Sequence, residues 1–156
     1  MHARDKDFDG YTVGETIPAP SRAITETDLV NFAGVSGDYH PLHVDEEYAK
    51  ASPFGGRIAH GMLTVSVVSG LMFAAGLASE HSMGFLGVEG LRFKSPVYPG
   101  DTVGVRIEVA GKRETSRGDR GVVTFHFQAV NVSRGGEVAC EGDWVQMYRR
   151  SAGGAA

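Results

Sequence analysis

The chain has 156 residues, of which 42% are hydrophobic and 22% are charged, and its formal net charge is −4. This length and composition are typical of one globular domain with its own core, and the negative charge offers no basic field to nucleic acid or anionic lipid. The single cysteine, Cys140, excludes an internal disulfide, and the charged N-terminus lacks the apolar core of a signal peptide. We therefore expect one cytoplasmic domain over residues 1–156 that binds no nucleic acid and spans no membrane.

The N-terminal part of the chain predicts a short strand and a helix. We expect residues 1–10 to be frayed and a strand to lie near Ser21–Ile24. Thr25 stands three residues before Asp28, which resembles a capping box with aspartate in place of glutamate and predicts the start of a helix. Gly34 and Gly37 are expected to end that helix.

Two further helices are expected before the middle of the chain. Loops over 37–44 and 52–57 flank a short helix, Asp45–Ala51, that has Asp45 as its N-cap. A long helix is expected from about His60 to Ser79, and its sequence is apolar on nearly all sides. Although it reaches the minimum length of a membrane span, we favour a helix buried in a protein core, because it contains several serines and glycines and has no flanking Lys or Arg.

The second half of the chain predicts a sheet. Apolar residues alternate with polar ones in segments separated by glycine-rich turns, as in strands with one buried face. The expected strands are Gly84–Val97, Val103–Val109, Val123–Ala129 and Val138–Tyr148. The tail from Arg149 is expected to be disordered. The result is an α+β domain with an ordered core over about 11–148, in which a curved antiparallel sheet or a second subunit covers the long helix.

The loop sequence GDYHPLH brings together residues suited to proton transfer. A carboxylate at Asp38 and an imidazole at His43 can accept one proton and donate another. Pro41 lies between them and stiffens the loop, holding His40 in extended backbone. From the spacing alone, a polar turn in which Asp38 caps the next residues explains the same sequence.

A second candidate feature is Gly61, at the expected first turn of the long helix. Backbone N–H groups there lack partners within the helix and stabilise developing negative charge. Ser69 follows eight residues later on about the same helix face, where its hydroxyl either points toward the site or bonds to its own helix. The alternative for Gly61 is that it only shapes a tight turn.

Several other site types are disfavoured. Asp38, His40, His43 and His60 contain metal-binding groups, but their spacing matches no recognised ligand pattern, so we expect no required metal ion. No glycine-rich nucleotide loop is present, and we expect no cofactor. Nothing near Cys140 in the sequence would lower the pKa of its thiol, which argues against a cysteine nucleophile.

Three phrases together resemble one family. They are SGDYHPLHVDEEYA, then GGRIAHGML, and later LRFKSPVYPGDT, and the resemblance spans about residues 11–148. It is a resemblance to the MaoC-like dehydratases, which include the (R)-specific enoyl-CoA hydratases. It implies a hot-dog fold, with the sheet wrapped around the long helix, and usually two such domains side by side. We therefore expect a homodimer or a higher homo-oligomer.

The resemblance also implies an activity and a set of site residues. Asp38 and His43 would be the catalytic pair, Gly61 would supply an oxyanion-hole N–H, and Ser69, His60 and His40 would lie at the substrate site. The implied substrate is an enoyl thioester of coenzyme A or of an acyl-carrier protein. The family most often has Asn where this chain has His40, so its acyl-chain preference does not transfer directly. Two alternatives remain open: a hot-dog thioesterase, and a non-catalytic acyl-binding subunit.

Overall fold

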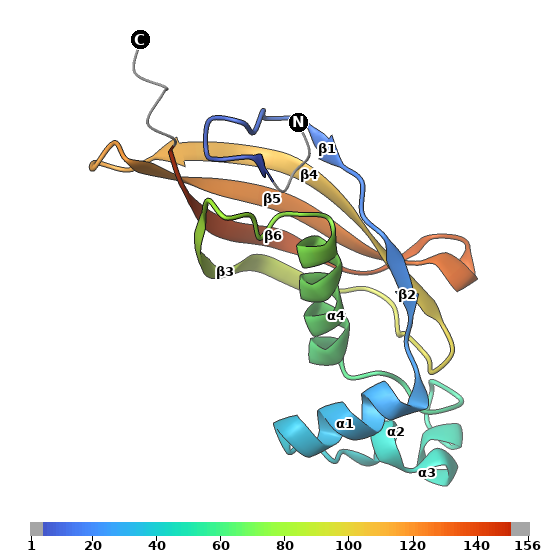
Figure 1. Ribbon diagram of the computed structural model, residues 1–156. Helices are drawn as coiled ribbons and strands as arrows, with labels where there is room; N and C mark the ends of the chain where they lie inside the picture. Colours follow the sequence, from blue (N-terminus) through green and yellow to red (C-terminus); the bar gives the residue numbers. More distant parts are fainter. Residues whose placement is uncertain (1–4, 151–156) are drawn as a thin grey trace.

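A computed structural model describes residues 5–150 of the protein (Figure 1). Its elements follow one another as short strands, helices and then long strands. They are β1 Thr16–Ile17, β2 Ser21–Ala23, α1 Glu26–Ser36, α2 Pro41–Val44, α3 Glu46–Lys50, α4 Gly61–Ala74, β3 Ser82–Phe93, β4 Thr102–Glu114, β5 Arg120–Asn131, the 3-10 turn η2 Val132–Arg134 and β6 Glu137–Arg149. The α+β prediction is thus confirmed.

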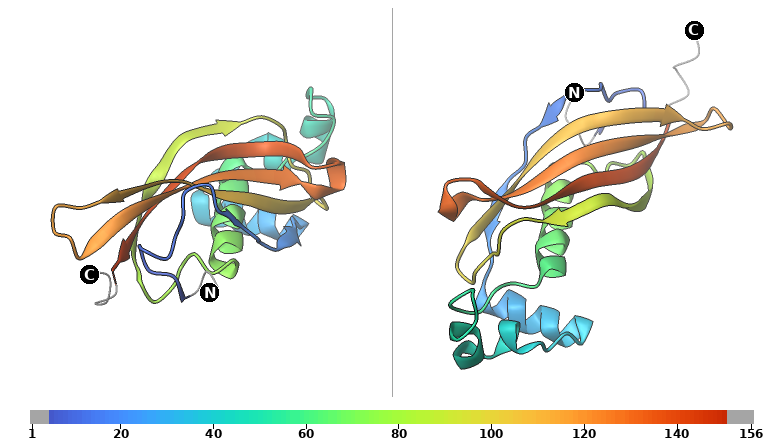
Figure 2. Two further views of the ribbon diagram at one scale, coloured as in Figure 1. Left: turned by 90° about the horizontal axis from the view of Figure 1, so that it is seen from above. Right: turned by 180° about the vertical axis from the view of Figure 1, so that it is seen from behind.

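One antiparallel sheet curves around α4, as both further views show (Figure 2). The strand order is β1-β4-β5-β6-β3, and β2 also pairs with β4. Val68 and Leu71 of α4 lie in the same buried cluster as Phe125 and Phe127 of β5. These apolar side chains on the concave side of the sheet bury one side of the helix, as expected for a curved sheet that covers it, while Met62 and Phe73 stay exposed.

Helix α4 is shorter than predicted: it ends at Ala74, whereas the prediction placed its end at Ser79. Gly76 adopts the left-handed conformation with φ at +93°. Its N–H donates to the carbonyl of Phe73, and the N–H of the buried Leu77 donates to the carbonyl of Met72. This pair of bonds is a Schellman motif, so the apolar sequence continues into the core while the helix stops.

The expected fraying of residues 1–10 is wrong for residues 5–10, while residues 1–4 lie outside the described part of the chain. Phe8 is buried against β5, where a Cβ atom built on Gly121 would come within 2.3 Å of its ring. At the other end, Arg149 completes β6 and Arg150 pairs with Asp9. The disordered tail was therefore predicted to begin too early, and residues 151–156 lie outside the described part.

Capping residues determine where α1, α2 and α3 begin or end. The Thr25–Asp28 capping box is present, and Gly37 ends α1 in the left-handed conformation. Asp45 caps α3 as predicted. The loop expected over 37–44 instead contains the single turn α2, with His40 as N-cap and Pro41 at the first position, where proline is favoured because its missing N–H needs no partner.

The structure also bears on the apolar stretch that reaches the length of a membrane span. Within residues 5–150, no helix is both long enough and apolar enough to cross a membrane.

Candidate active site

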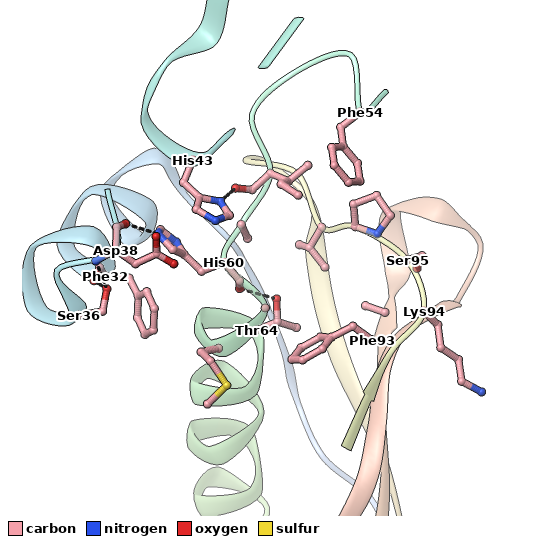
Figure 3. A pocket seen from close by; sticks show the side chains of 17 residues that line it. Phe32, Ser36, Asp38, His43, Phe54, His60, Thr64, Phe93, Lys94 and Ser95 are labelled. Carbon is pink, nitrogen blue, oxygen red and sulfur yellow. Dashed lines mark hydrogen bonds between the residues drawn. The ribbon is translucent and has the colours of Figure 1, made fainter. Parts of the chain in front are cut away.

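A pocket of about 650 Å³ opens beside the N-terminal end of α4 (Figure 3). Asp38, His43, His60 and Gly61 all line it. Most of its remaining wall is apolar and includes Phe32, Phe54, Ile58, Met62, Phe93, Pro96 and Val97. An apolar pocket with a few convergent polar groups suits a small ligand with a hydrocarbon part.

The tautomer of His43 is fixed by a backbone carbonyl. Its Nδ1 lies 2.8 Å from the oxygen of Ile58. A carbonyl oxygen only accepts, so Nδ1 must carry the proton and Nε2 has a free lone pair in the neutral ring. The structure therefore presents His43 as a proton acceptor.

His60 is buried next to His43 and has a similar anchor. Its Nε2 lies 2.9 Å from the backbone oxygen of Asp38 and donates to it. The rings of His60 and His43 stack, with centroids 3.8 Å apart. The buried Nδ1 of His60 has no hydrogen-bond partner among residues 5–150. His60 thus joins the start of α4 to the loop that carries Asp38.

Asp38 is exposed at the pocket, and its carboxylate accepts the N–H of His40 at 3.2 Å. One oxygen of this carboxylate and one ring nitrogen each of His43 and His60 lie within 4.8 Å of one another. Folding therefore brings Asp38 and His43 close enough to share one water molecule. The short Asp38–His40 turn shows that the alternative loop-shaping role is also present.

Gly61 begins α4 at the pocket, but a protein side chain occupies the space beside its Cα. A Cβ atom built on Gly61 would lie 2.7 Å from Cε1 of Phe93. Glycine is needed at this position because the ring of Phe93 approaches so closely. The expected space for a ligand against Gly61 is thus partly filled by an aromatic ring from β3.

Two predicted site residues are not among the seventeen that line the pocket, Ser69 and His40. Ser69 lies farther along α4 and is half-buried. His40 caps α2, since its Nδ1 accepts the N–H of Leu42 at 3.2 Å. Asparagine also makes this type of cap, so histidine and asparagine suit the same capping position.

One contributor to the site, Ile58, could not be predicted from its residue type, because it acts through its backbone. Its N–H donates to Leu42, and its carbonyl accepts from His43. The role of Phe93 was likewise missed, because the sequence placed it inside the expected strand Gly84–Val97, whereas β3 ends at Phe93.

A metal ion would find suitable donors here, because Asp38, His43 and His60 present a carboxylate and two imidazoles within 4.8 Å of one another. His40 does not belong to this cluster. The same three groups also suit metal-free proton transfer, and an activity without a metal ion stays a prediction.

The environment of His43 favours the neutral ring. Burial is the largest influence and lowers its pKa from the usual 6.5, while the bond to Ile58 opposes this. The charge of a protonated His60 would lower the pKa further, and Asp38 raises it. A neutral imidazole at pH 7 is what a general base requires.

We predict that His43 titrates below pH 6.5 in the folded protein, which proton NMR of its ring can measure. Because the unfolded chain binds this proton more readily, folding stability should fall as the pH drops below about 6.5 and level off below the folded pKa. In His43→Gln this part of the pH dependence should disappear. A folded pKa above 6.5 would contradict the prediction.

Comparisons with known proteins identify the family of the chain. The family model described as "MaoC like domain" matches residues 9–130. Protein MaoC of Klebsiella aerogenes is 39% identical over 120 residues, which are 77% of this chain and 35% of that protein. An (R)-specific enoyl-CoA hydratase of Aeromonas caviae is 34% identical over 125 residues, 80% of this chain and 87% of that one.

Solved structures give the same result for the fold. A protein described as a monoamine oxidase regulatory protein from Archaeoglobus is 33% identical, with a TM-score of 0.86 over 94% of this chain and 95% of that one. The curved sheet around α4 is a hot-dog fold. This chain spans only about a third of the length of the Klebsiella protein, yet the family match covers most of its own residues. The chain belongs to the MaoC-like domain family.

Proposed function

We propose that the protein is a cytoplasmic hydratase that adds water to a trans-2-enoyl thioester and gives a (3R)-3-hydroxyacyl thioester, reversibly and without a cofactor. The observation that carries the proposal is the meeting of Asp38 with His43, whose proton is held on Nδ1, at an apolar pocket. The similar Aeromonas protein is described as an (R)-specific enoyl-CoA hydratase. The thioester carrier is coenzyme A or an acyl-carrier protein.

In the proposed reaction, Asp38 and His43 bind one water molecule between them. One member of the pair takes a proton from this water as its oxygen bonds to the β-carbon. The electrons of the double bond move toward the thioester carbonyl, and the pair then delivers a proton to the α-carbon. General acid–base catalysis of this kind contributes about 10²–10⁴-fold to a rate.

The negative charge that develops on the thioester oxygen needs a donor, and the proposal assigns the N–H of Gly61. This N–H belongs to the first turn of α4, where intrahelical partners are lacking. One such donor is worth about 3 kcal/mol in other enzymes. His60 would hold the Asp38 loop at this end of the helix, and the proposal retains supporting roles at the substrate site for His40 and Ser69.

A thioesterase is the main alternative, since it would use the same kind of acyl pocket. Cys140 does not support a thiol nucleophile, because it is fully buried in β6 and burial raises the pKa of its thiol to about 11. Asp38 and His43 suit activation of water in either reaction. The products distinguish the two activities: hydrolysis releases a free thiol, whereas hydration removes the enoyl absorbance.

We predict that Asp38→Asn and His43→Ala each lower kcat for enoyl hydration by about 100-fold or more, because each removes a group that handles a proton in the transition state. KM should change less. Since both side chains serve one water molecule, the double variant should be little worse than either single variant. Steady-state kinetics of folded protein, checked by thermal unfolding, provides the measurement.

Asp45→Asn is the matched control, because the carboxylate of Asp45 also accepts a nearby backbone N–H, that of Tyr48 at 3.0 Å, but Asp45 lies outside the pocket lining. Its kcat should stay near wild type. If Asp38 only shapes its loop, Asp38→Asn will lower the melting temperature and leave turnover per folded molecule intact. Hydration that survives both site substitutions within a few-fold would refute the mechanism.

The proposal includes a homodimer, and exposed apolar side chains support it. Strand β3 lies at the edge of the sheet. It exposes Phe85 and Leu86 by 54% and 52%, while α4 exposes Met62 and Phe73 by 54% and 63%. An unpaired strand edge beside exposed apolar side chains is typical of a protein–protein interface. A second copy of the chain, related by a two-fold axis, would pair with the edge of β3 and cover these side chains.

Light scattering at micromolar concentration should therefore give at least twice the chain mass of 16.6 kDa. Leu86→Glu should shift the protein toward monomer by placing a charge at the interface. Val35→Glu should leave the assembly unchanged, because Val35 is 82% exposed on α1, which lies away from β3 (Figure 1). A stable, active wild-type monomer would disprove this part of the proposal.

A further inference from the structure

Arg57 joins three parts of the chain that surround the pocket. It lies in the connection between α3 and α4. Its Nη2 is 2.7 Å from a carboxylate oxygen of Glu26 in α1, and its Nε is 3.0 Å from a carboxylate oxygen of Glu46 in α3. The side chain of Arg57 is only 19% exposed. Such a planar guanidinium with two partners fixes direction as well as distance.

The residue after Arg57 holds the turn that carries His43. The N–H of Ile58 donates to the carbonyl of Leu42 at 3.2 Å, and the carbonyl of Ile58 accepts Nδ1–H of His43 at 2.8 Å. Helix α2 is a single turn with no buried residue. A helix this short is not stable by itself, so its orientation depends on these outside contacts.

The Ile58 peptide is itself held from both sides. On the C-terminal side, the N–H of Ala59 donates to the carbonyl of Val97 at 2.7 Å. On the N-terminal side stand Gly55 and Gly56, which restrict the backbone little. The hydrogen bond from the Tyr98 hydroxyl to the carbonyl of Phe54 holds this loop farther away, and the side chain of Arg57 is the anchor directly next to Ile58.

We propose that Arg57 is a positioning residue for His43. Its two ion pairs hold the Ile58 peptide against α2, and the peptide keeps the proton of the neutral His43 ring on Nδ1 and aims Nε2 at the pocket. The role in the reaction rests on the hydratase function proposed above, whereas the effect on the ring does not. Exposed ion pairs add little stability, so the consequence of losing Arg57 is geometric.

Arg57→Met tests the proposal, since it keeps much of the side-chain length and removes the charge. Arg22→Met is the matched control, because Arg22 also pairs with a carboxylate of α1, Asp28, at 2.6 Å, whereas its side-chain hydrogen bonds within the described residues go to Ala23 and Asp28 and not to the 57–60 segment. Nitrogen-15 NMR of His43 at a pH where the ring is neutral reports which nitrogen carries the proton. Kinetics of enoyl hydration gives kcat and KM for the same proteins.

In wild type and Arg22→Met, we expect the proton on Nδ1 and equal kcat. In Arg57→Met, the two nitrogen signals should move toward each other as both tautomers become populated. Its kcat should fall about 10-fold or more with KM within a few-fold, because displacing a catalytic group by about 1 Å costs up to about 100-fold. In Arg57→Lys, kcat and the nitrogen signals of His43 should lie between those of wild type and Arg57→Met, since one ammonium replaces only part of the contact with the two carboxylates.

An unchanged His43 tautomer in Arg57→Met overturns the proposal, whatever the activity. A changed tautomer with unchanged kcat overturns the role in the reaction. If the wild type hydrates no enoyl thioester, the proposed function fails while the NMR comparison still decides the positioning of the ring. Should Arg57→Met not fold, Glu26→Gln and Glu46→Gln each remove the charge of one exposed carboxylate partner of Arg57 and allow the same comparison.

Discussion

Two hydrogen bonds from imidazole rings to backbone carbonyls hold the proposed site together. His43 donates to Ile58, and His60 donates to Asp38. Each bond joins the 57–60 segment to the 38–43 segment, and the two rings stack on each other. Because a carbonyl accepts but never donates, these bonds also decide where each ring carries its proton. The same contacts therefore fix both the position of each ring and the nitrogen that carries the proton in its neutral form.

The rest of the fold supports this segment from the sheet side. Asp101, in the PGD turn before β4, accepts hydrogen bonds from Tyr98, Asn131 and Arg134. The hydroxyl of Tyr98 donates to the carbonyl of Phe54, which lines the pocket. The third distinctive phrase of the sequence thus connects the strands to the pocket wall. Its effect on the site is indirect, through the loop that precedes α4.

The sequence predicted those elements whose signal is local. Strands β4, β5 and β6 follow from alternation, because one face of each strand meets the concave core. The capping box is also a local signal, and it predicted the start of α1 correctly. The end of α4 was missed because the apolar pattern continues past Gly76 into the buried Leu77. Phe8 was missed because nothing near it in the sequence indicates the space that Gly121 leaves for its ring.

The residues of the candidate site also divide into those with a local sequence signal and those without one. Spacing alone left Asp38 and His43 as an ordinary turn, and the family resemblance singled them out. The backbone of Ile58 and the close approach of Phe93 to Gly61 depend on segments distant in the chain, so no local pattern reveals them. His40 shows the reverse case. It departs from the resembled family in sequence, yet it fills a capping position that asparagine also suits.

The central claim is that Asp38 and His43 direct water to the β-carbon of an enoyl thioester. Incubation of the protein with a short trans-2-enoyl thioester in oxygen-18 water, followed by mass spectrometry and chiral analysis, tests it most directly. The account predicts one labelled oxygen at C3 of an intact (3R)-3-hydroxyacyl thioester. Label found only in a released carboxylate, with free thiol, would contradict it and identify a thioesterase. Unlabelled, unchanged substrate across a range of acyl chains would contradict it in favour of a non-catalytic acyl-binding subunit.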